Sequence, residues 1–183
     1  MIKVCRPYKN ATLQKMAQGF STSHQANDFA SFYGDWLVAP FNAQVASVVS
    51  AGPLSASTDD LRRGYGMRLV STEDPTVSIS YWHCLPFFPV KKDDTVVQGQ
   101  PVAQMGNSGF VLSGGSYVEV DIRTIPPYPG THVHISMGQQ SGDTYTALDM
   151  SKLIDFNIPI KYDVLTAIRS VLQKIINLLN KTI

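Results

Sequence analysis

The four histidines of this 183-residue chain all fall within short motifs that also carry other reactive groups. The motifs are His24-Gln-Ala-Asn-Asp28, Tyr81-Trp-His83 and His132-Val-His134. Histidine is the common metal ligand among the side chains, and it titrates near neutral pH. Because the first motif adds a spaced aspartate, the pattern favours a metal centre with acid and base groups beside it.

His132 and His134 are two residues apart, in a stretch that is typical of a β-strand. Residues i and i+2 of a strand point to the same face, roughly 6–7 Å apart. That separation is too large for both imidazoles to bind one ion easily. The pair therefore suits one metal ligand and one neighbour that handles protons.

His24 and Asp28 can share an ion only if the backbone between them bends or forms a helical turn. Four extended residues span roughly 13 Å, whereas each donor atom must lie about 2 Å from the metal. Two imidazoles and one carboxylate leave an open position for water in a catalytic zinc site. A further histidine can then move the proton of that water to a leaving amine, and another can stabilise the charge on a tetrahedral intermediate.

Two simpler interpretations stay open on the motifs alone, namely scattered structural histidines and a metal site without catalysis. Composition excludes other classes. Net charge is +1 and charged residues make up 16% of the chain, with no basic stripe, so we expect no nucleic-acid partner. Hydrophobic residues make up 44%, enough for a real core.

No stretch reaches the roughly 18 apolar residues of a membrane span, so we expect no transmembrane segment. The first residues also lack the apolar run of a signal peptide, which predicts synthesis in the cytoplasm and another route to any site of action outside it. For Cys5 and Cys84 we expect free thiols rather than a disulfide. Cys84 adjoins His83, and we interpret it as a small buried residue rather than an additional metal ligand.

The elements that must position these residues are mostly strands. Short β-branched or alternating runs, separated by Gly, Pro, Asp and Ser, predict an all-β sandwich or barrel. In residues 116–123 the alternation predicts that Val118, Val120 and Ile122 face inward, and that Glu119, Asp121 and Arg123 face water. The expected strands are residues 46–50, 67–71, 77–81, 96–104, 118–123 and 132–137.

The last forty or so residues have helical periodicity instead. We expect a short helix over residues 147–154 and a longer amphipathic helix over about residues 163–182, whose apolar residues follow heptad spacing. This helix could pack on its own domain, associate with another copy or a partner protein, or lie on a membrane surface.

Five sequence pieces, in order, resemble the lysostaphin/LytM-type zinc metallopeptidases, over roughly residues 18–137. The first and last are the H-x-G-x-D-like motif at His24 and the G-x-H-x-H motif that ends at His134. The resemblance implies the duplicated hybrid motif fold of that family, a mainly β, antiparallel sandwich or barrel-like domain. We expect this domain over residues 1–138, followed by a C-terminal extension with the helix over residues 139–183. The other three pieces are Val38-Ala-Pro-Phe-Asn-Ala-Gln-Val45, Gly64-Tyr-Gly66 with Ser80-Tyr-Trp-His83, and Val96-Val-Gln-Gly-Gln-Pro-Val-Ala-Gln-Met-Gly-Asn-Ser-Gly109.

The resemblance also implies a role for each candidate residue. One Zn²⁺ per chain would be held by His24, Asp28 and His134. His132 would act as general base and then as general acid, and His83 would polarise the water or stabilise the oxyanion. The implied reaction is hydrolysis of a peptide bond in the stems or cross-bridges of bacterial peptidoglycan.

The chain departs from the family pattern at two places that matter. Ala26 stands where the family has the glycine of H-x-G-x-D, and residues 110–129 form an insertion before the H-x-H pair. The insertion is expected to border the cleft and to affect substrate choice. Candidate cleft aromatics are Tyr81, Tyr128 and Trp82, although the core is an alternative place for Tyr81 and Trp82.

Together these features predict a phage-encoded cell-wall endopeptidase associated with the virion or its tail, acting at the bacterial cell wall. The C-terminal helix would provide contacts with a tail protein or a second copy. The main alternative is a non-catalytic structural or wall-binding tail module that keeps the fold. A phosphocarrier with paired histidines is a weaker alternative, because it would leave Asp28 without a role.

Overall fold

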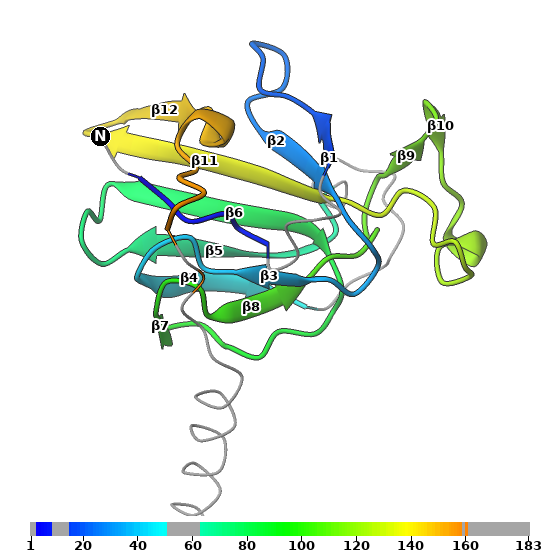
Figure 1. The fold of residues 1–183 in the computed structure, drawn as a ribbon, viewed down its shortest axis with the longest axis horizontal. Coiled ribbons are helices and arrows are strands. Elements are labelled where there is room, and N and C mark those ends of the chain that lie inside the picture. The colour runs from blue at the N-terminus through cyan, green and yellow to red at the C-terminus, as the bar shows by residue number, and fades with distance from the viewer. Residues whose placement is uncertain (1–2, 9–14, 51–62, 159, 161–183) are drawn as a thin grey trace, which may run out of the picture.

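Antiparallel β-strands form nearly all the regular structure of the protein (Figure 1). The computed structural model describes residues 3–8, 15–50, 63–158 and 160. In this part of the chain no helix is long and apolar enough to cross a membrane. The elements are β1 (Lys15–Gln18), β2 (Asn27–Ala30), β3 (Trp36–Val38), β4 (Ala43–Val49), β5 (Tyr65–Ser71), β6 (Val77–Cys84), β7 (Thr95–Val96), β8 (Pro101–Gln104), β9 (Leu112–Ser113), β10 (Ser116–Tyr117), the 3₁₀ turn η1 (Val120–Ile122), β11 (Val133–Ser141), β12 (Thr144–Leu148) and the 3₁₀ turn η2 (Met150–Lys152).

The main sheet has eight strands in the order β1-β2-β11-β6-β5-β4-β7, with β12 paired to β11. All of its neighbouring strands run antiparallel. Strand β11 lies centrally, since it pairs with β2 and β12 along one edge and with β6 along the other. Strands β1 and β7 do not pair with each other, so the sheet is open and not a closed barrel.

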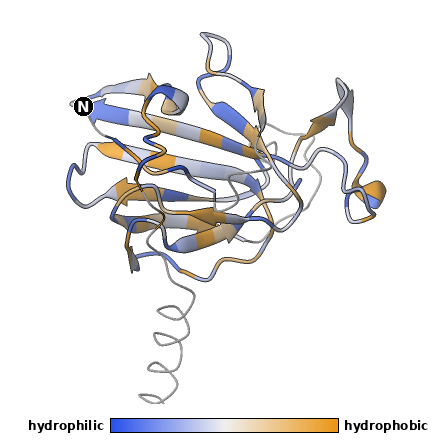
Figure 2. Cartoon of the chain, viewed as in Figure 1, coloured by the Kyte–Doolittle hydropathy of each residue, from blue (hydrophilic) through white to orange (hydrophobic). Residues whose placement is uncertain are grey.

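The core lies on one face of this sheet, where the two-stranded sheet of β3 and β8 packs (Figure 1). Val133, Ile135 and Met137 of β11 have no exposed surface. Because side chains alternate along a strand, His132, His134 and Ser136 lie on the opposite face. Figure 2 shows the corresponding bands of hydrophobic and hydrophilic residues along the strands. The sheet thus has a hydrophobic face against the core and an opposite face that carries the polar side chains of the candidate site.

Most of the expected strands are present, with shifted ends. Residues 46–50, 67–71, 77–81 and 132–137 fall largely in β4, β5, β6 and β11. The expected strand over residues 96–104 is divided into β7 and β8 by a turn at Gly99, whose φ is +83°. A positive φ of this kind is readily adopted only by glycine.

The expected strand over residues 118–123 is wrong. This segment contains η1, Ile122 is 44% exposed, and Arg123, which was expected to face water, is completely buried. The Arg123 guanidinium donates hydrogen bonds to the backbone carbonyls of Val118, Asn107 and Gly109. The alternating pattern failed here because no described strand pairs with this segment, and the buried guanidinium provides hydrogen bonds that a neighbouring strand would otherwise provide.

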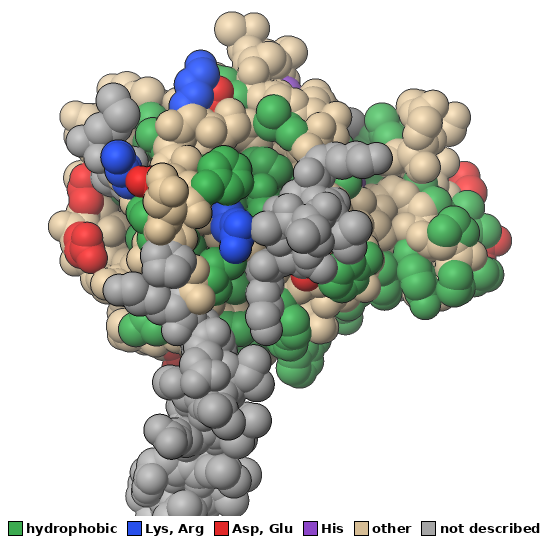
Figure 3. All heavy atoms as spheres, in the orientation of Figure 1, with side chains coloured by type: hydrophobic (Ala, Val, Ile, Leu, Met, Phe, Trp, Pro, Cys, Tyr) green, Lys and Arg blue, Asp and Glu red, His purple; other side chains and the backbone are tan. Residues whose placement is uncertain are grey.

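Residues 110–129 form an arm beside the main sheet (Figure 1). The arm consists of the β9–β10 hairpin and η1, with the buried Arg123 at its base. Its outer end is apolar, because Ile122 and Ile125 are 44% and 56% exposed (Figure 3).

The segment that follows β11 also differs from expectation. The short helix expected over residues 147–154 is instead the end of β12, followed by η2. The domain boundary expected after residue 138 falls within β11, which runs to Ser141. The helix expected over about residues 163–182 lies outside the described residues. Cys5 and Cys84 are both buried free thiols, as expected.

Candidate metal centre

Asp28 and His134 face each other across two neighbouring strands. They are direct partners in the register of β2 and β11, so their side chains lie on the same face of the sheet. His24 comes from the turn before β2, where Ser21 and His24 exchange backbone hydrogen bonds. The chain bends again at Ala26 before it enters β2. The bend that the spacing required is therefore present.

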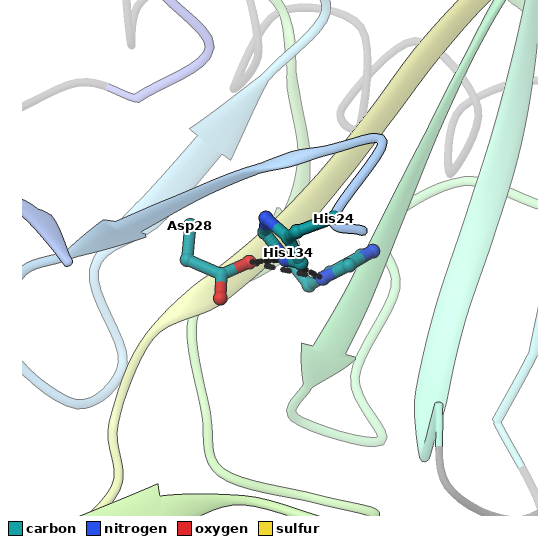
Figure 4. Close-up of side chains that lie close together, drawn as sticks. All are labelled: His24, Asp28 and His134. Carbon is teal, nitrogen blue, oxygen red and sulfur yellow. Dashed lines mark hydrogen bonds and ion pairs between the residues drawn. The ribbon is translucent and has the colours of Figure 1, made fainter. Parts of the chain in front are cut away.

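The donor atoms of these three residues converge on one point (Figure 4). His24 Nε2 lies 3.3 Å from His134 Nδ1 and 3.4 Å from Asp28 Oδ1, and His134 Nδ1 lies 2.9 Å from the same oxygen. Ligands at about 2.0–2.1 Å from a tetrahedral zinc lie about 3.3–3.4 Å from one another. The triangle of donors therefore fits a zinc ion, with one edge slightly short.

The hydrogen bonds behind the two imidazoles direct the correct nitrogens inward. His24 Nδ1 lies 3.2 Å from the carbonyl oxygen of Gly19, and His134 Nε2 lies 3.1 Å from the hydroxyl of Ser136. A carbonyl oxygen only accepts, so His24 must carry its proton on Nδ1 and present the Nε2 lone pair. Outer partners of this kind orient metal-ligating histidines.

Asp28 provides independent support for a cation. Its Oδ1 is buried and meets no donor with full hydrogen-bond geometry among the described residues; its nearest polar neighbours are His134 Nδ1 at 2.9 Å and His24 Nε2 at 3.4 Å. Burial raises the pKa of this carboxyl, but the surrounding imidazoles, His134 first, outweigh burial and hold the pKa below its usual value. A buried carboxylate oxygen without a donor is unfavourable unless a cation compensates it.

His132 and His83 lie beside the triad and are held in matching tautomers. His132 Nδ1 is 2.8 Å from the Gly130 carbonyl oxygen, and His83 Nδ1 is 2.7 Å from that of Ser108. Both therefore donate through Nδ1 and keep a lone pair on Nε2. The two ring centroids are 4.7 Å apart, and His132 Nε2 lies 4.0 Å from Asp28 Oδ2.

Both of these imidazoles are neutral at neutral pH. Burial lowers the pKa of His132, and burial together with the nearby His132 lowers the pKa of His83 to about 3. A neutral imidazole can accept a proton, which a general base requires. The four histidines of the sequence motifs come from separate segments of the chain and thus meet at one place.

Solved structures of known peptidases share this arrangement of strands. A zinc-containing peptidase from Vibrio cholerae matches 81% of this chain and 39% of its own, with 16% identity and a TM-score of 0.55. The catalytic domain of lysostaphin, an antimicrobial peptidase from Staphylococcus simulans, matches 79% of this chain and 90% of its own, with 19% identity and a TM-score of 0.50. The catalytic domain of the prophage-encoded protein EnpA from Enterococcus faecalis matches 79% and 94%, with 17% identity and a TM-score of 0.50.

The chain has the fold of the lysostaphin/LytM-type peptidases. At these identities the likeness concerns the fold alone. The chain spans less than half the length of the Vibrio structure. No family model matches the sequence, and no curated protein matches it either.

In this peptidase fold the triad and the two further histidines line a cavity of about 760 Å³. The arm formed by residues 110–129 contributes one wall, through Phe110 and the tip of the β9–β10 hairpin. That tip is a tight turn at Gly114 and Gly115, whose φ values are +58° and +85°. A two-residue hairpin turn with both φ values positive strongly favours glycine. The insertion thus borders the cavity, as the sequence led us to expect.

The cleft aromatics are only partly where we expected them. Tyr81 is completely buried, and its hydroxyl donates to the Val38 carbonyl oxygen at 2.9 Å, so it belongs to the core. Tyr128 does not line the cavity; its ring stacks on Tyr33 with centroids 4.4 Å apart. Trp82 does line the cavity.

Sequence reasoning predicted that the insertion borders the cavity, but it did not single out Phe110 and Leu112 at the start of that insertion. It missed Arg63, which lies just before β5. For Phe110 and Leu112 the position beside the family's G-N-T-G piece was an available signal. For Arg63 the sequence holds none, because only strand pairing brings it next to His83.

Proposed function

We propose that this protein is a zinc-dependent endopeptidase that hydrolyses peptide bonds in the stems or cross-bridges of bacterial peptidoglycan. The observation that carries the proposal is the convergence of the His24, Asp28 and His134 donors beside two neutral imidazoles, in a cavity. The substrate class rests on the resemblance of the sequence motifs to the lysostaphin/LytM-type enzymes and on the shared fold.

In the proposed reaction, metal binding and proton transfer fall to different residues. When bound by His24, Asp28 and His134, zinc supplies Lewis acidity, which lowers the pKa of water and polarises a carbonyl group. His132 presents the lone pair of Nε2 into the site, so it can accept a proton from the attacking water and return it to the leaving amine. Its hydrogen bond to Gly130 keeps the ring in that tautomer.

His83 is suited to orienting the water rather than to donating to an oxyanion. Its only ring proton is already bonded to the Ser108 carbonyl oxygen, and a pKa of about 3 keeps the ring neutral. Its Nε2 therefore accepts hydrogen bonds and has none to donate. Of the two roles that the resemblance implies for His83, the geometry supports the first.

The proposal also includes the place where the enzyme acts. A phage-encoded protein carried on the virion or its tail, acting at the bacterial cell wall, is in keeping with a fold shared with a prophage-encoded protein. A tail-protein partner or a second copy would contact residues 163–182. The non-catalytic tail module is less favoured, because the described residues retain all three metal donors and the base.

Two variants test the enzyme proposal. We expect His134→Ala to lose most of its zinc, because it removes a ligand, and His132→Ala to keep about one zinc per chain. Both should lose lysis of purified cell walls by at least about a hundredfold, since general base catalysis alone contributes that much. Elemental analysis and wall turbidity are the measurements. Wild-type protein that binds zinc but releases no peptide ends from walls would instead support the non-catalytic module.

A further inference from the structure

Arg63 is the one permanently charged side chain, apart from Asp28, among the described residues that line the cavity. The mechanism above does not use it. The salt bridges of the described part of the chain do not include it. Since no acidic side chain among the described residues pairs with it, we take the Arg63 guanidinium as a group that can pair with a ligand in the cavity.

The position of Arg63 is set by the strands that carry the metal centre. Its carbonyl oxygen accepts a hydrogen bond of 3.0 Å from the backbone N–H of His83. Its guanidinium carbon lies 5.4 Å from the ring centroid of Trp82, in a cation–π contact. Trp82 is the direct partner of His134 in the register of β6 and β11.

Asp28, His134 and Trp82 therefore form one row across β2, β11 and β6, on the face of the sheet that bears the site. Gly66 on β5 makes room at the end of this row, because a Cβ there would lie 2.3 Å from Trp82 Cε3. The indole is thus pressed against the backbone of β5, and Arg63 lies over a fixed platform.

This row sets the distance from the guanidinium to the reaction centre. Neighbouring side chains in such a row are about 5 Å apart. A second step of similar size reaches Arg63, which places its guanidinium on the order of 10 Å from His134. An extended peptide covers that distance in about three residues.

We propose that Arg63, on its Trp82 platform, binds a carboxylate of the substrate on one side of the scissile bond, so that the enzyme selects peptides with a free carboxylate over amidated ones. The planar guanidinium matches a carboxylate with two parallel hydrogen bonds. Phe110 and Leu112, which line the same cavity, would take an apolar part of the same peptide. This inference rests on the proposed function and names the substrate class of the same site.

The test is a binding measurement on the full chain, in the His132→Ala background so that bound peptide is not turned over. The probes are a peptidoglycan stem peptide with free carboxylates and the same peptide with every carboxylate converted to carboxamide. Titration calorimetry should show the free peptide binding at least about tenfold more tightly, as expected for charge-assisted hydrogen bonds. Arg63→Gln should reduce this ratio to within twofold, and Arg63→Lys should leave an intermediate ratio.

Arg68→Gln is the matched control. It removes the same charge from the adjacent strand β5, but Arg68 hydrogen-bonds Ser78 and does not line the cavity. For Arg68→Gln, the ratio between the affinities for the free and the amidated peptide should equal that of the His132→Ala parent. Equal binding of both peptides, no binding of either, or a preference that survives Arg63→Gln would each overturn the inference. Digestion of cell walls by the enzyme with His132 intact tests the proposed function separately.

Discussion

Backbone carbonyls determine the tautomers of the imidazoles in this site. Gly19, Gly130 and Ser108 each offer a carbonyl oxygen to the Nδ1 of one histidine. The consequence is that each of these rings turns an Nε2 lone pair toward the common centre. Burial then lowers the pKa of His83 and of His132, which keeps both rings neutral at neutral pH.

The low pKa of His83 has a consequence for stability. In the folded state this pKa is about 3, against an ordinary value of 6.5. Below pH 6.5 the unfolded chain therefore binds a proton that the folded chain does not. As pH falls from 6.5 toward 3, His83 should lower the free energy of unfolding by up to about 1.4 kcal/mol per pH unit.

His83→Asn isolates this effect. Asparagine can donate to the Ser108 carbonyl oxygen from nearly the same position, and it tolerates the φ of +63° found at this residue. Urea unfolding in the presence of a chelator should show a stability gap between wild type and variant that shifts in favour of the variant as pH falls. A gap that is constant between pH 7 and 4 would contradict the low pKa.

Among the elements, the arm of residues 110–129 is the segment that the motif pattern predicts to be an insertion. Arg123 ties it to the loop that holds His83. The guanidinium donates to the carbonyls of Asn107 and Gly109, and the carbonyl of Ser108 between them accepts from His83. The Asn107 amide in turn donates to the carbonyls of Arg123 and Pro129. The arm and the loop therefore stabilise each other.

Replacing Arg123 should destabilise both the arm and the loop that holds His83. Arg123→Met leaves several buried carbonyl oxygens without donors, at a cost of about 1–3 kcal/mol for each such group. We expect the free energy of unfolding to fall by about 3 kcal/mol or more, and amide exchange in residues 112–123 to accelerate. The exposed Arg68→Met should cost less than about 1 kcal/mol. Similar losses in both variants would mean that Arg123 does not hold the arm.

For the molecule as a whole, the metal centre connects segments that are distant in sequence. His24 lies in a turn outside the sheet, whereas Asp28 and His134 lie within it. A bound ion would therefore hold the turn before β2 against β11. An ion that binds only the folded chain must also stabilise it.

Zinc should accordingly raise the melting temperature of the chelator-treated protein. At a free zinc concentration of 100 times Kd the gain is about 2.7 kcal/mol, or roughly 5–11 °C for a chain of this length. His132→Ala should show the same shift in a thermal melt. Asp28→Asn and His134→Ala should show much less. A shift that survives both ligand replacements would place the zinc elsewhere.

The sequence by itself determined the β class and the set of residues that meet at the site. It could do so because the alternation along β11 and the five spaced motifs depend only on local order. The resemblance of these motifs to the lysostaphin/LytM-type peptidases is what grouped His24, Asp28 and His134 as ligands before their positions were known.

Only the tertiary structure decided which side chains face the cavity. Arg123 is buried rather than exposed, Tyr81 is in the core, and Arg63 lies beside His83. Each of these depends on contacts between segments far apart in the chain, made by strand pairing or by a long side chain that reaches distant carbonyls. Local periodicity carries no information about such contacts, so the residues that line the cavity could be identified only from the fold.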